Sequence, residues 1–238
     1  MKSTNNERKT FSMADFEKGL MLAGLVAPST VEELNEIRVL DKYEKELKKE
    51  KKNTYFKRVV LAAEIANELH AEPTLGRIKF QKLVYLCEHA AEMGLHQRYL
   101  KLTAGPFDNK FMHTIEGEFQ RNEWFRVDKI TERGITRSKY VPLANINGYK
   151  EYYARYFEDR QHSIRYVIDL FRKQKSTFTE IAATLFACFV NLKNANHPIV
   201  ISKLLEEFYK WSERKTQFKE DEVVSVWNWM LEKGLVAV

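Results

Sequence analysis

The spacing of apolar residues predicts a mainly helical chain. In the segment RIKFQKLVYLCEHAAEMG, apolar side chains recur every three or four residues, the period of one helix face, and Gly94 is a natural end for that helix. Its apolar stripe consists of Phe80, Leu83, Val84, Cys87 and Ala91. The preceding helix, from Thr54 to the break at Pro73, has an equivalent stripe of Val59, Ala62, Ile65, Ala66 and Leu69.

The pattern changes after these two helices. Asp108 is a good N-cap for a helix over DNKFMHTIEGEFQRN, which places Phe111, Ile115 and Phe119 on one face. Runs of β-prone residues follow over 124–130 and 138–143, and the glycine-containing loop between them predicts a β-hairpin. We therefore expect residues 54–145 to form a winged-helix-like unit, in which a helix pair packs under a small hairpin.

The two ends of the chain are also predicted to be helical. Residues 146–238 have the pattern of a long aromatic helix followed by three shorter ones, which form a C-terminal trihelical unit. Residues 1–53 are expected to form N-terminal helices and a charged connector, KYEKELKKEKK, which is exposed because it has few apolar side chains. The expected fold class is mainly α (α+β), with one small hairpin as its β part.

Composition supports a globular protein. With 238 residues, 44% of them hydrophobic, the chain is long enough to bury a substantial core. No stretch approaches the roughly 18 apolar residues that span a bilayer, so we expect a soluble cytoplasmic protein without membrane contact. Cys87 and Cys188 lie in apolar helical patterns, which suits buried free thiols in a reducing compartment. The sequence does not fix the oligomeric state.

The charge is moderately basic, with a net charge of +6 and a pI near 9.1, and this permits a local anion-binding patch. One group of cations lies at a helix start, where the macrodipole prefers acids: Arg77, Lys79 and Lys82. A second group lies on the hairpin: Arg126, Lys129, Arg133, Arg137 and Lys139. The two elements could flank one DNA duplex through its phosphates. The alternative is that these cations are solvated side chains at a helix end and on a loop.

The sequence does not indicate an enzyme. It has no glycine-rich phosphate loop, no HExxH, no CxxC and no Gly-x-Ser-x-Gly elbow, and its six histidines are scattered. The hairpin segment RVDK has the residue types of a metal-dependent nuclease site, but such a site needs a second acid, and no clear candidate lies upstream. We therefore predict no catalytic residues, no metal site and no cofactor.

The pairing of KFQKLVYL with AGPFDNKFMHTIEGEF resembles the Panacea domain, which is found in many antitoxins and proteolysis-related adaptors. The resemblance extends over residues 55–142 and rests on a helix, a small-residue turn and a second helix. The matching positions are Lys79, Gln81, Lys82, Leu83, Tyr85, Gly105 and Pro106. Phe107 and Asp108 also make this stretch similar to modules associated with the C-terminal parts of type I restriction specificity subunits.

The resemblance implies a non-catalytic binding or regulatory protein of a bacterial toxin–antitoxin or restriction–modification system, with a role in phage defence. It implies a protein partner, either a toxin or a restriction–modification subunit. The residues expected to bind that partner are Gln81, Lys82, Tyr85, Gly105, Pro106 and Asp108. The alternative for Tyr85 is a structural role, in which its ring packs and its hydroxyl caps a backbone group. A DNA-binding transcriptional regulator that uses the basic helix and hairpin is the alternative, and a metal-dependent nuclease is a third.

Overall fold

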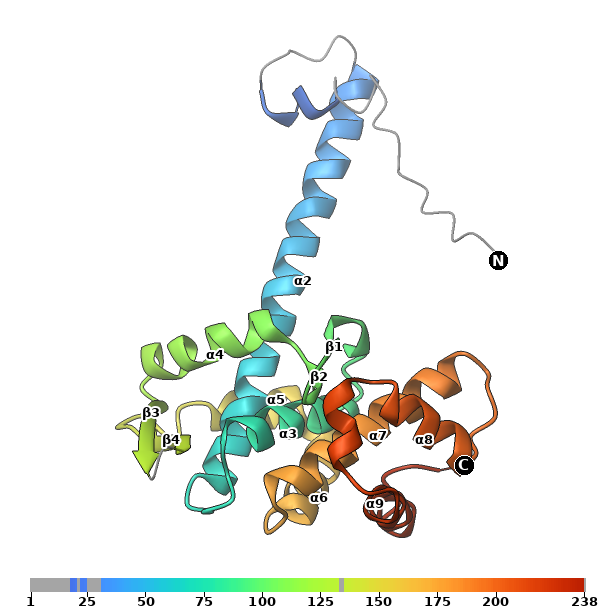
Figure 1. The fold of residues 1–238 in the computed structure, drawn as a ribbon. Coiled ribbons are helices and arrows are strands. Elements are labelled where there is room, and N and C mark those ends of the chain that lie inside the picture. The colour runs from blue at the N-terminus through green and yellow to red at the C-terminus, as the bar shows by residue number, and fades with distance from the viewer. Residues whose placement is uncertain (1–17, 21, 25–30, 133–134, 238) are drawn as a thin grey trace. The chain divides into compact units, whose positions relative to one another are not determined.

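The computed structural model describes residues 18–20, 22–24, 31–132 and 135–237 (Figure 1). The chain divides into two compact units, residues 1–55 and residues 56–238. The first boundary lies close to the predicted end of the charged connector. The predicted parts 54–145 and 146–238 fall almost entirely within the second unit, because helices from both pack together there.

Helix α2, Val31–Leu69, changes character along its length. Residues 42–53 are almost all exposed and charged, and pairs such as Lys45 with Asp41 lie one turn apart. From Arg58 to Ala66 every residue is buried. The exposure of the charged segment confirms that it has too few apolar side chains to hold it on a core.

The core of the second unit is built around helix α3, Arg77–Ala90. This helix packs against α6, Gln161–Phe171, and α7, Ser176–Asn194, and it also contacts strand β2, Gly105–Phe107. Strand β2 pairs antiparallel with β1, Leu100–Leu102, a two-stranded sheet that the sequence did not predict. The predicted stripe of α3 is confirmed, because Phe80, Leu83 and Cys87 have no exposed surface.

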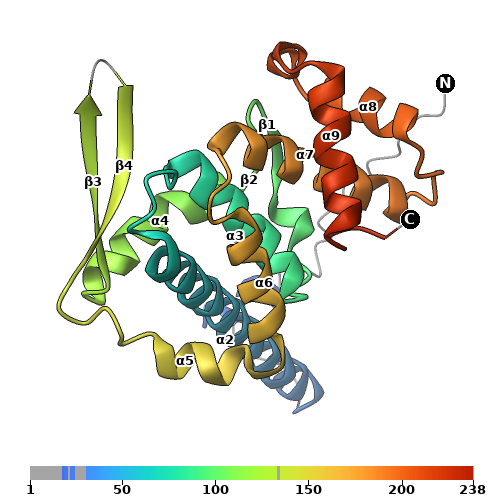
Figure 2. The same ribbon diagram turned by 90° about the horizontal axis from the view of Figure 1, so that it is seen from below.

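Helix α4, Asn109–Arg121, leads into the predicted hairpin. Asp108 caps this helix as expected, because its carboxylate accepts a hydrogen bond from the Phe111 backbone N–H at 3.0 Å. Strands β3, Phe125–Glu132, and β4, Ile135–Pro142, pair antiparallel. The hairpin lies on the side of this unit away from α8 and α9 (Figure 2).

The remaining elements are helical. The long aromatic segment is divided, since α5 ends at Tyr156 and a short 3-10 turn precedes α6. The bounds of these elements are Lys150–Tyr156 for α5, Ile201–Tyr209 for α8 and Glu220–Glu232 for α9, with 3-10 turns η1 at His96–Arg98, η2 at Glu158–Arg160 and η3 at Glu213–Gln217. The fold is mainly helical with two small antiparallel hairpins, which confirms the predicted class. Within the described residues no helix is long and apolar enough to cross a membrane.

Candidate functional site

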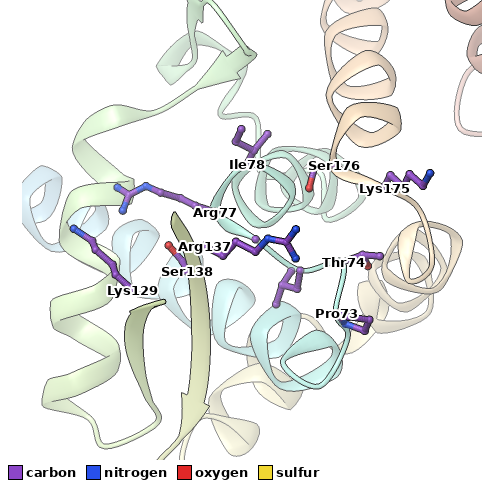
Figure 3. Close-up of a pocket in the computed structure, with 11 residues that line it drawn as sticks. Pro73, Thr74, Arg77, Ile78, Lys129, Arg137, Ser138, Lys175 and Ser176 are labelled. Carbon is purple, nitrogen blue, oxygen red and sulfur yellow. The ribbon is translucent and has the colours of Figure 1, made fainter. Parts of the chain in front are cut away.

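A cavity of about 660 Å³ opens where the start of α3, the β3–β4 hairpin and the start of α7 meet (Figure 3). We call it the basic cleft. Its lining residues are Pro73, Thr74, Leu75, Gly76, Arg77, Ile78, Lys129, Arg137, Ser138, Lys175 and Ser176. Three stretches that are distant in the sequence therefore form one cavity, and each contributes at least one cation.

The cleft is positively charged. Arg77 is half-buried and pairs with Glu116 of α4 at 2.7 Å, whereas Lys129, Arg137 and Lys175 are exposed and form no ion pair with a described residue. Among the described residues that line the cleft, none is acidic. Because these cations line one cavity whose described lining has no acidic residue, the cleft is suited to a negatively charged ligand.

Hydroxyl groups and helix starts add hydrogen-bond donors to these cations. Ser138 is only 9% exposed, and its hydroxyl, which lines the cleft, has no hydrogen-bond partner among the described residues. Helix α3 begins after Gly76 and α7 begins after Lys175, in both cases without a side-chain cap. The first backbone N–H groups of both helices therefore remain free to bind an anion.

The hairpin wall is fixed to α3 by aromatic packing. The ring of Tyr140 on β4 stacks on Phe80 of α3 with centroids 4.6 Å apart, and Phe125 on β3 contacts Phe119 of α4. Lys129 lies directly opposite Ser138 in the register, so both side chains project from the same face of the hairpin. In Figure 3, the Arg137 side chain extends from β4 towards Thr74.

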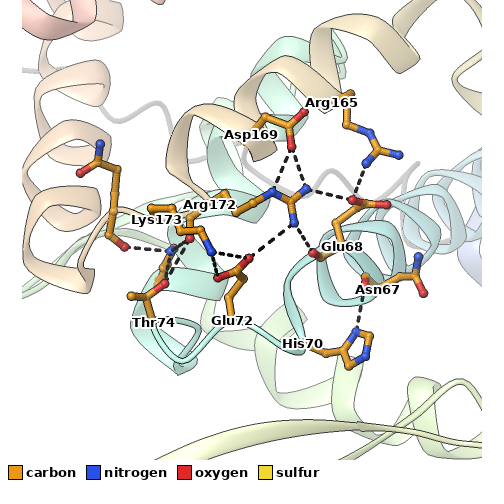
Figure 4. Close-up of polar contacts among 11 residues, drawn as sticks. Asn67, Glu68, His70, Glu72, Thr74, Arg165, Asp169, Arg172 and Lys173 are labelled. Atoms are coloured by element: carbon orange, nitrogen blue, oxygen red, sulfur yellow. Dashed lines mark hydrogen bonds and ion pairs between the residues drawn. The ribbon is translucent and has the colours of Figure 1, made fainter.

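The opposite wall is fixed by hydrogen bonds of Lys79 and Arg172. Figure 4 shows Arg172 between Glu68 and Asp169 in this network. The Lys79 ammonium donates hydrogen bonds to Thr74 Oγ1 at 2.7 Å, to the Arg172 carbonyl at 2.9 Å and to the Gln174 carbonyl at 2.8 Å. Arg172 in turn donates to the Glu68 carbonyl at 2.6 Å and to Asp169 at 2.7 Å. These bonds join the loop before α3 to the turn before α7, and both segments line the cleft.

The structure corrects the expected exposure of Lys79 and Lys82, since both side chains are completely buried. Burial lowers the pKa of Lys79 to about 8, and burial together with nearby Lys215 lowers the pKa of Lys82 to about 7. The Lys82 ammonium donates to the Pro106 carbonyl at 2.7 Å. Neither lysine reaches a surface where it could meet a phosphate.

The other hairpin cations have different positions. Arg126 forms a double hydrogen bond to Asp128, at 2.7 and 3.0 Å, which lowers the pKa of that carboxyl. Neither Arg126 nor Asp128 is among the described residues that line the cleft. Lys139 lines an adjoining cavity of about 280 Å³ that shares Arg137 and Ser138 with the cleft. Arg133 lies outside the described residues.

The residues expected to bind a protein partner are mostly interior. Gln81 is half-buried, but the other five are buried, and this corrects their assignment to a surface: Lys82, Tyr85, Gly105, Pro106 and Asp108. Asp108 belongs to a buried ionic cluster, in which the Arg58 guanidinium donates to Glu88 at 2.6 Å and to Asp108 at 2.7 Å. The Gly105-Pro106 turn, which carries the resemblance to the Panacea domain, therefore has a structural position in the core.

Sequence reasoning missed four residues of the cleft with polar side chains: Thr74, Ser138, Lys175 and Ser176. The segment KST at 175–177, directly before an apolar helix, carries a cation and two hydroxyls, and it is the signal that could have indicated an anion site. Ser138 gives no such signal, because its burial depends on the packing of the hairpin. Among the described residues, no group of three potential metal ligands occurs.

Comparison with known proteins adds no assignment. No family model matches the chain significantly, and no curated protein and no solved structure does so either. The resemblance to the Panacea domain, and to the modules of restriction specificity subunits, therefore stays a prediction from the residues that carry it.

Proposed function

We propose that this protein binds nucleic acid through its phosphates, with the basic cleft as the contact surface. The observation that carries the proposal is the gathering of Arg77, Lys129, Arg137 and Lys175 around one cavity whose described lining has no acidic residue. Phosphate oxygens accept hydrogen bonds from lysine, arginine, hydroxyl and helix-start N–H groups, and the cleft offers all four donor types.

The arrangement of α3 beside the β3–β4 hairpin supports the winged-helix-like interpretation of residues 54–145. In such units, a helix and a hairpin contact the same nucleic acid from adjacent sides. Here, the helix contributes its first turn with Arg77, and the hairpin contributes Lys129 and Arg137. The buried free thiols Cys87 and Cys188 are consistent with a cytoplasmic location.

The test is a binding titration of labelled duplex DNA of about 20 base pairs, read by fluorescence anisotropy at several salt concentrations. We expect affinity to fall as salt rises, and the Lys129→Ala/Arg137→Ala variant to bind at least tenfold more weakly. Arg126→Ala is the matched control, because it removes one exposed cation of the same hairpin that already pairs with Asp128.

Two outcomes would contradict the proposal. Equal losses in the cleft variant and in Arg126→Ala would show that general charge, and not the cleft, determines binding. Cleavage of the duplex by pure protein in the presence of Mg²⁺ would indicate a nuclease instead of a binding protein.

The antitoxin or restriction–modification setting, including its protein partner, remains a proposal that rests on the sequence resemblance. Purification from the native cells at low salt, with mass spectrometry of co-eluting proteins, tests it separately from the DNA titration. A stoichiometric partner protein would support it, and the absence of any such protein at low salt would contradict it.

A further inference from the structure

We infer that the basic cleft receives one unpaired nucleotide, so that the protein prefers single-stranded nucleic acid to a blunt duplex. This inference rests on the proposed function and specifies its ligand. It follows from three features of the cleft: its volume, its apolar floor beside the cations, and the free hydroxyl of Ser138.

The volume suits a small ligand. Cavities that enclose small molecules measure about 300–1,000 Å³, and the cleft, at about 660 Å³, lies within that range. A cavity of this size is too small for a duplex, whose bases stay stacked and paired unless unstacking energy is supplied. A single strand exposes its bases without this cost, so one of its nucleotides can enter the cleft.

The lining is more apolar than phosphate binding alone requires. Pro73, Leu75 and Ile78 line the cleft on the α3 side, next to the cations of the hairpin. A phosphate gains nothing from apolar neighbours, whereas a nucleobase has an apolar face that packs against them. The combination of apolar and cationic walls therefore matches a nucleotide better than an isolated anion.

The cations lie on two sides of the apolar part of the lining, which consists of Pro73, Leu75 and Ile78. Arg77, Lys129 and Arg137 belong to the hairpin side, and Lys175 with Ser176 lies on the opposite side (Figure 3). A nucleotide within a strand has a phosphate on each side, so both groups of cations can be used at once. The hydroxyl of Ser138, a residue that lines the cleft, is then available to a polar edge of the base or to the sugar.

The experiment compares four probes on the full chain by competition against a labelled oligonucleotide. They are a single strand of about 12 nucleotides, a blunt duplex with the same number of phosphates, free dAMP and deoxyadenosine. We expect the single strand to bind more tightly than the duplex. We also expect dAMP to compete where deoxyadenosine does not, because the phosphate supplies the charge.

Two charge-neutral variants test entry into the cleft. Ser138→Ala and Ile78→Ser should each weaken single-strand binding by about 3–10-fold, the typical effect of one lost hydrogen bond or apolar contact. Ile78→Ser removes no phosphate donor and should leave duplex binding unchanged. The matched controls are Ser225→Ala and Ile201→Ser, which change exposed residues on α9 and α8. Thermal unfolding verifies that each variant folds.

The outcomes separate this inference from the proposed function. Equal binding of single strand and duplex, with no effect of either cleft variant, would overturn the inference and leave phosphate binding intact. A lack of binding to every oligonucleotide at low salt would overturn both. Competition by dAMP as strong as that by the single strand would support the nucleotide site and identify a free nucleotide as its source.

Discussion

The ammonium nitrogen of Lys79 lies 2.8 Å from the carbonyl oxygen of Gln174, a residue 95 positions further along the chain. The same ammonium also bonds to Thr74 and to the Arg172 carbonyl. Lys79 thereby joins the loop before α3 to the turn before α7, two walls of the basic cleft. Its own side chain is buried and cannot contact a ligand in the cleft.

Replacement of Lys79 by Met should therefore weaken binding in the cleft without removing a surface charge. The variant leaves the Arg172 and Gln174 carbonyls without their donor, which we expect to cost about 1–3 kcal/mol of unfolding free energy. Urea denaturation and the single-strand titration measure the two effects. Lys173→Ala is the control, because its exposed pair with Glu72 should contribute less than about 1 kcal/mol. Unchanged binding in Lys79→Met would contradict the positioning role.

The buried ammonium of Lys82 predicts a stability that rises with pH above neutrality. Its pKa is lowered from 10.5 to about 7 in the folded protein by burial and by nearby Lys215. Between these values the Lys82 side chain holds more protons in the unfolded chain than in the folded one, so its contribution makes the unfolding free energy increase with pH, by at most about 1.4 kcal/mol per pH unit. Urea denaturation at a series of pH values from 7 upwards measures this slope.

In Lys82→Met the slope should become smaller, and the part that remains should begin nearer pH 8, where Lys79 loses its proton. A wild-type stability that falls as the pH rises from 7 through 8 would show that Lys82 is not the buried ammonium described here.

The Arg58 cluster predicts a large penalty for removal of its cation. In Arg58→Met, both Glu88 and Asp108 would lose their charged partner, and breaking a buried pair in this way typically costs about 3–5 kcal/mol. Addition of Glu88→Gln should restore part of the loss, because it removes one uncompensated charge. The comparison is Arg121→Met, which removes an exposed pair with Glu118. Equal effects of Arg58→Met and Arg121→Met in urea denaturation would refute the prediction.

Gly105 is expected to tolerate no side chain. Its φ angle is +102°, and a Cβ atom would lie 2.6 Å from the Thr184 hydroxyl oxygen. We expect Gly105→Ala to destabilise the protein by about 1–3 kcal/mol through backbone strain and overpacking. In the Thr184→Ala background the cost should be smaller, because the contact is gone and only the strain remains.

The control for this pair of variants is Gly117→Ala in α4, where a Cβ would meet no atom within 4 Å. That substitution should stabilise the helix by about 0.5–1 kcal/mol. Thermal or urea unfolding of the wild type and of these variants distinguishes the outcomes, and a Gly105→Ala variant as stable as Gly117→Ala would contradict them.

The salt dependence of nucleic-acid binding gives a count of the phosphates that the cleft neutralises. Each contact that is lost should reduce the slope of log K against log salt by about 0.7 for a single strand. Lys129→Ala and Arg137→Ala should each show this reduction, whereas Arg126→Ala should show little, because Asp128 already neutralises it. A wild-type slope in all three variants would mean that none of these cations meets a phosphate.

Local patterns predicted the helices and the hairpin, because the cause of each lies within a few residues. Asp108 caps α4 through a bond to Phe111, only three positions away. The burial of Lys79 and Lys82 depends on hydrogen-bond partners that lie much further along the chain, including Arg172 and Pro106. Their cationic character indicated exposure, and only the packing of α6, α7 and β2 around α3 shows that both are interior.

The residues of the candidate site also fall into two groups: those that the sequence indicated and those that only tertiary contacts bring to the cleft. The basic character of the hairpin and of Arg77 was evident from sequence, and the structure places Arg77, Lys129 and Arg137 in one cavity. The contribution of α7 was not evident, because Lys175 and Ser176 reach the cleft only through the turn that Lys79 holds. The missed residues are those whose position depends on tertiary contacts.

The walls of the cleft come from residues 73–78, from Lys129, Arg137 and Ser138 of the hairpin, and from residues 175–176, so the cavity exists only when all three parts have reached their native positions. A chain with its helices formed but not yet docked has no such cavity. A nucleotide that binds there consequently recognises the native state alone and raises the apparent melting temperature by mass action. In the cell, the bound ligand would therefore stabilise the native state. Chains that carry the ligand unfold less often, and they expose fewer unfolded segments to proteases than chains without it.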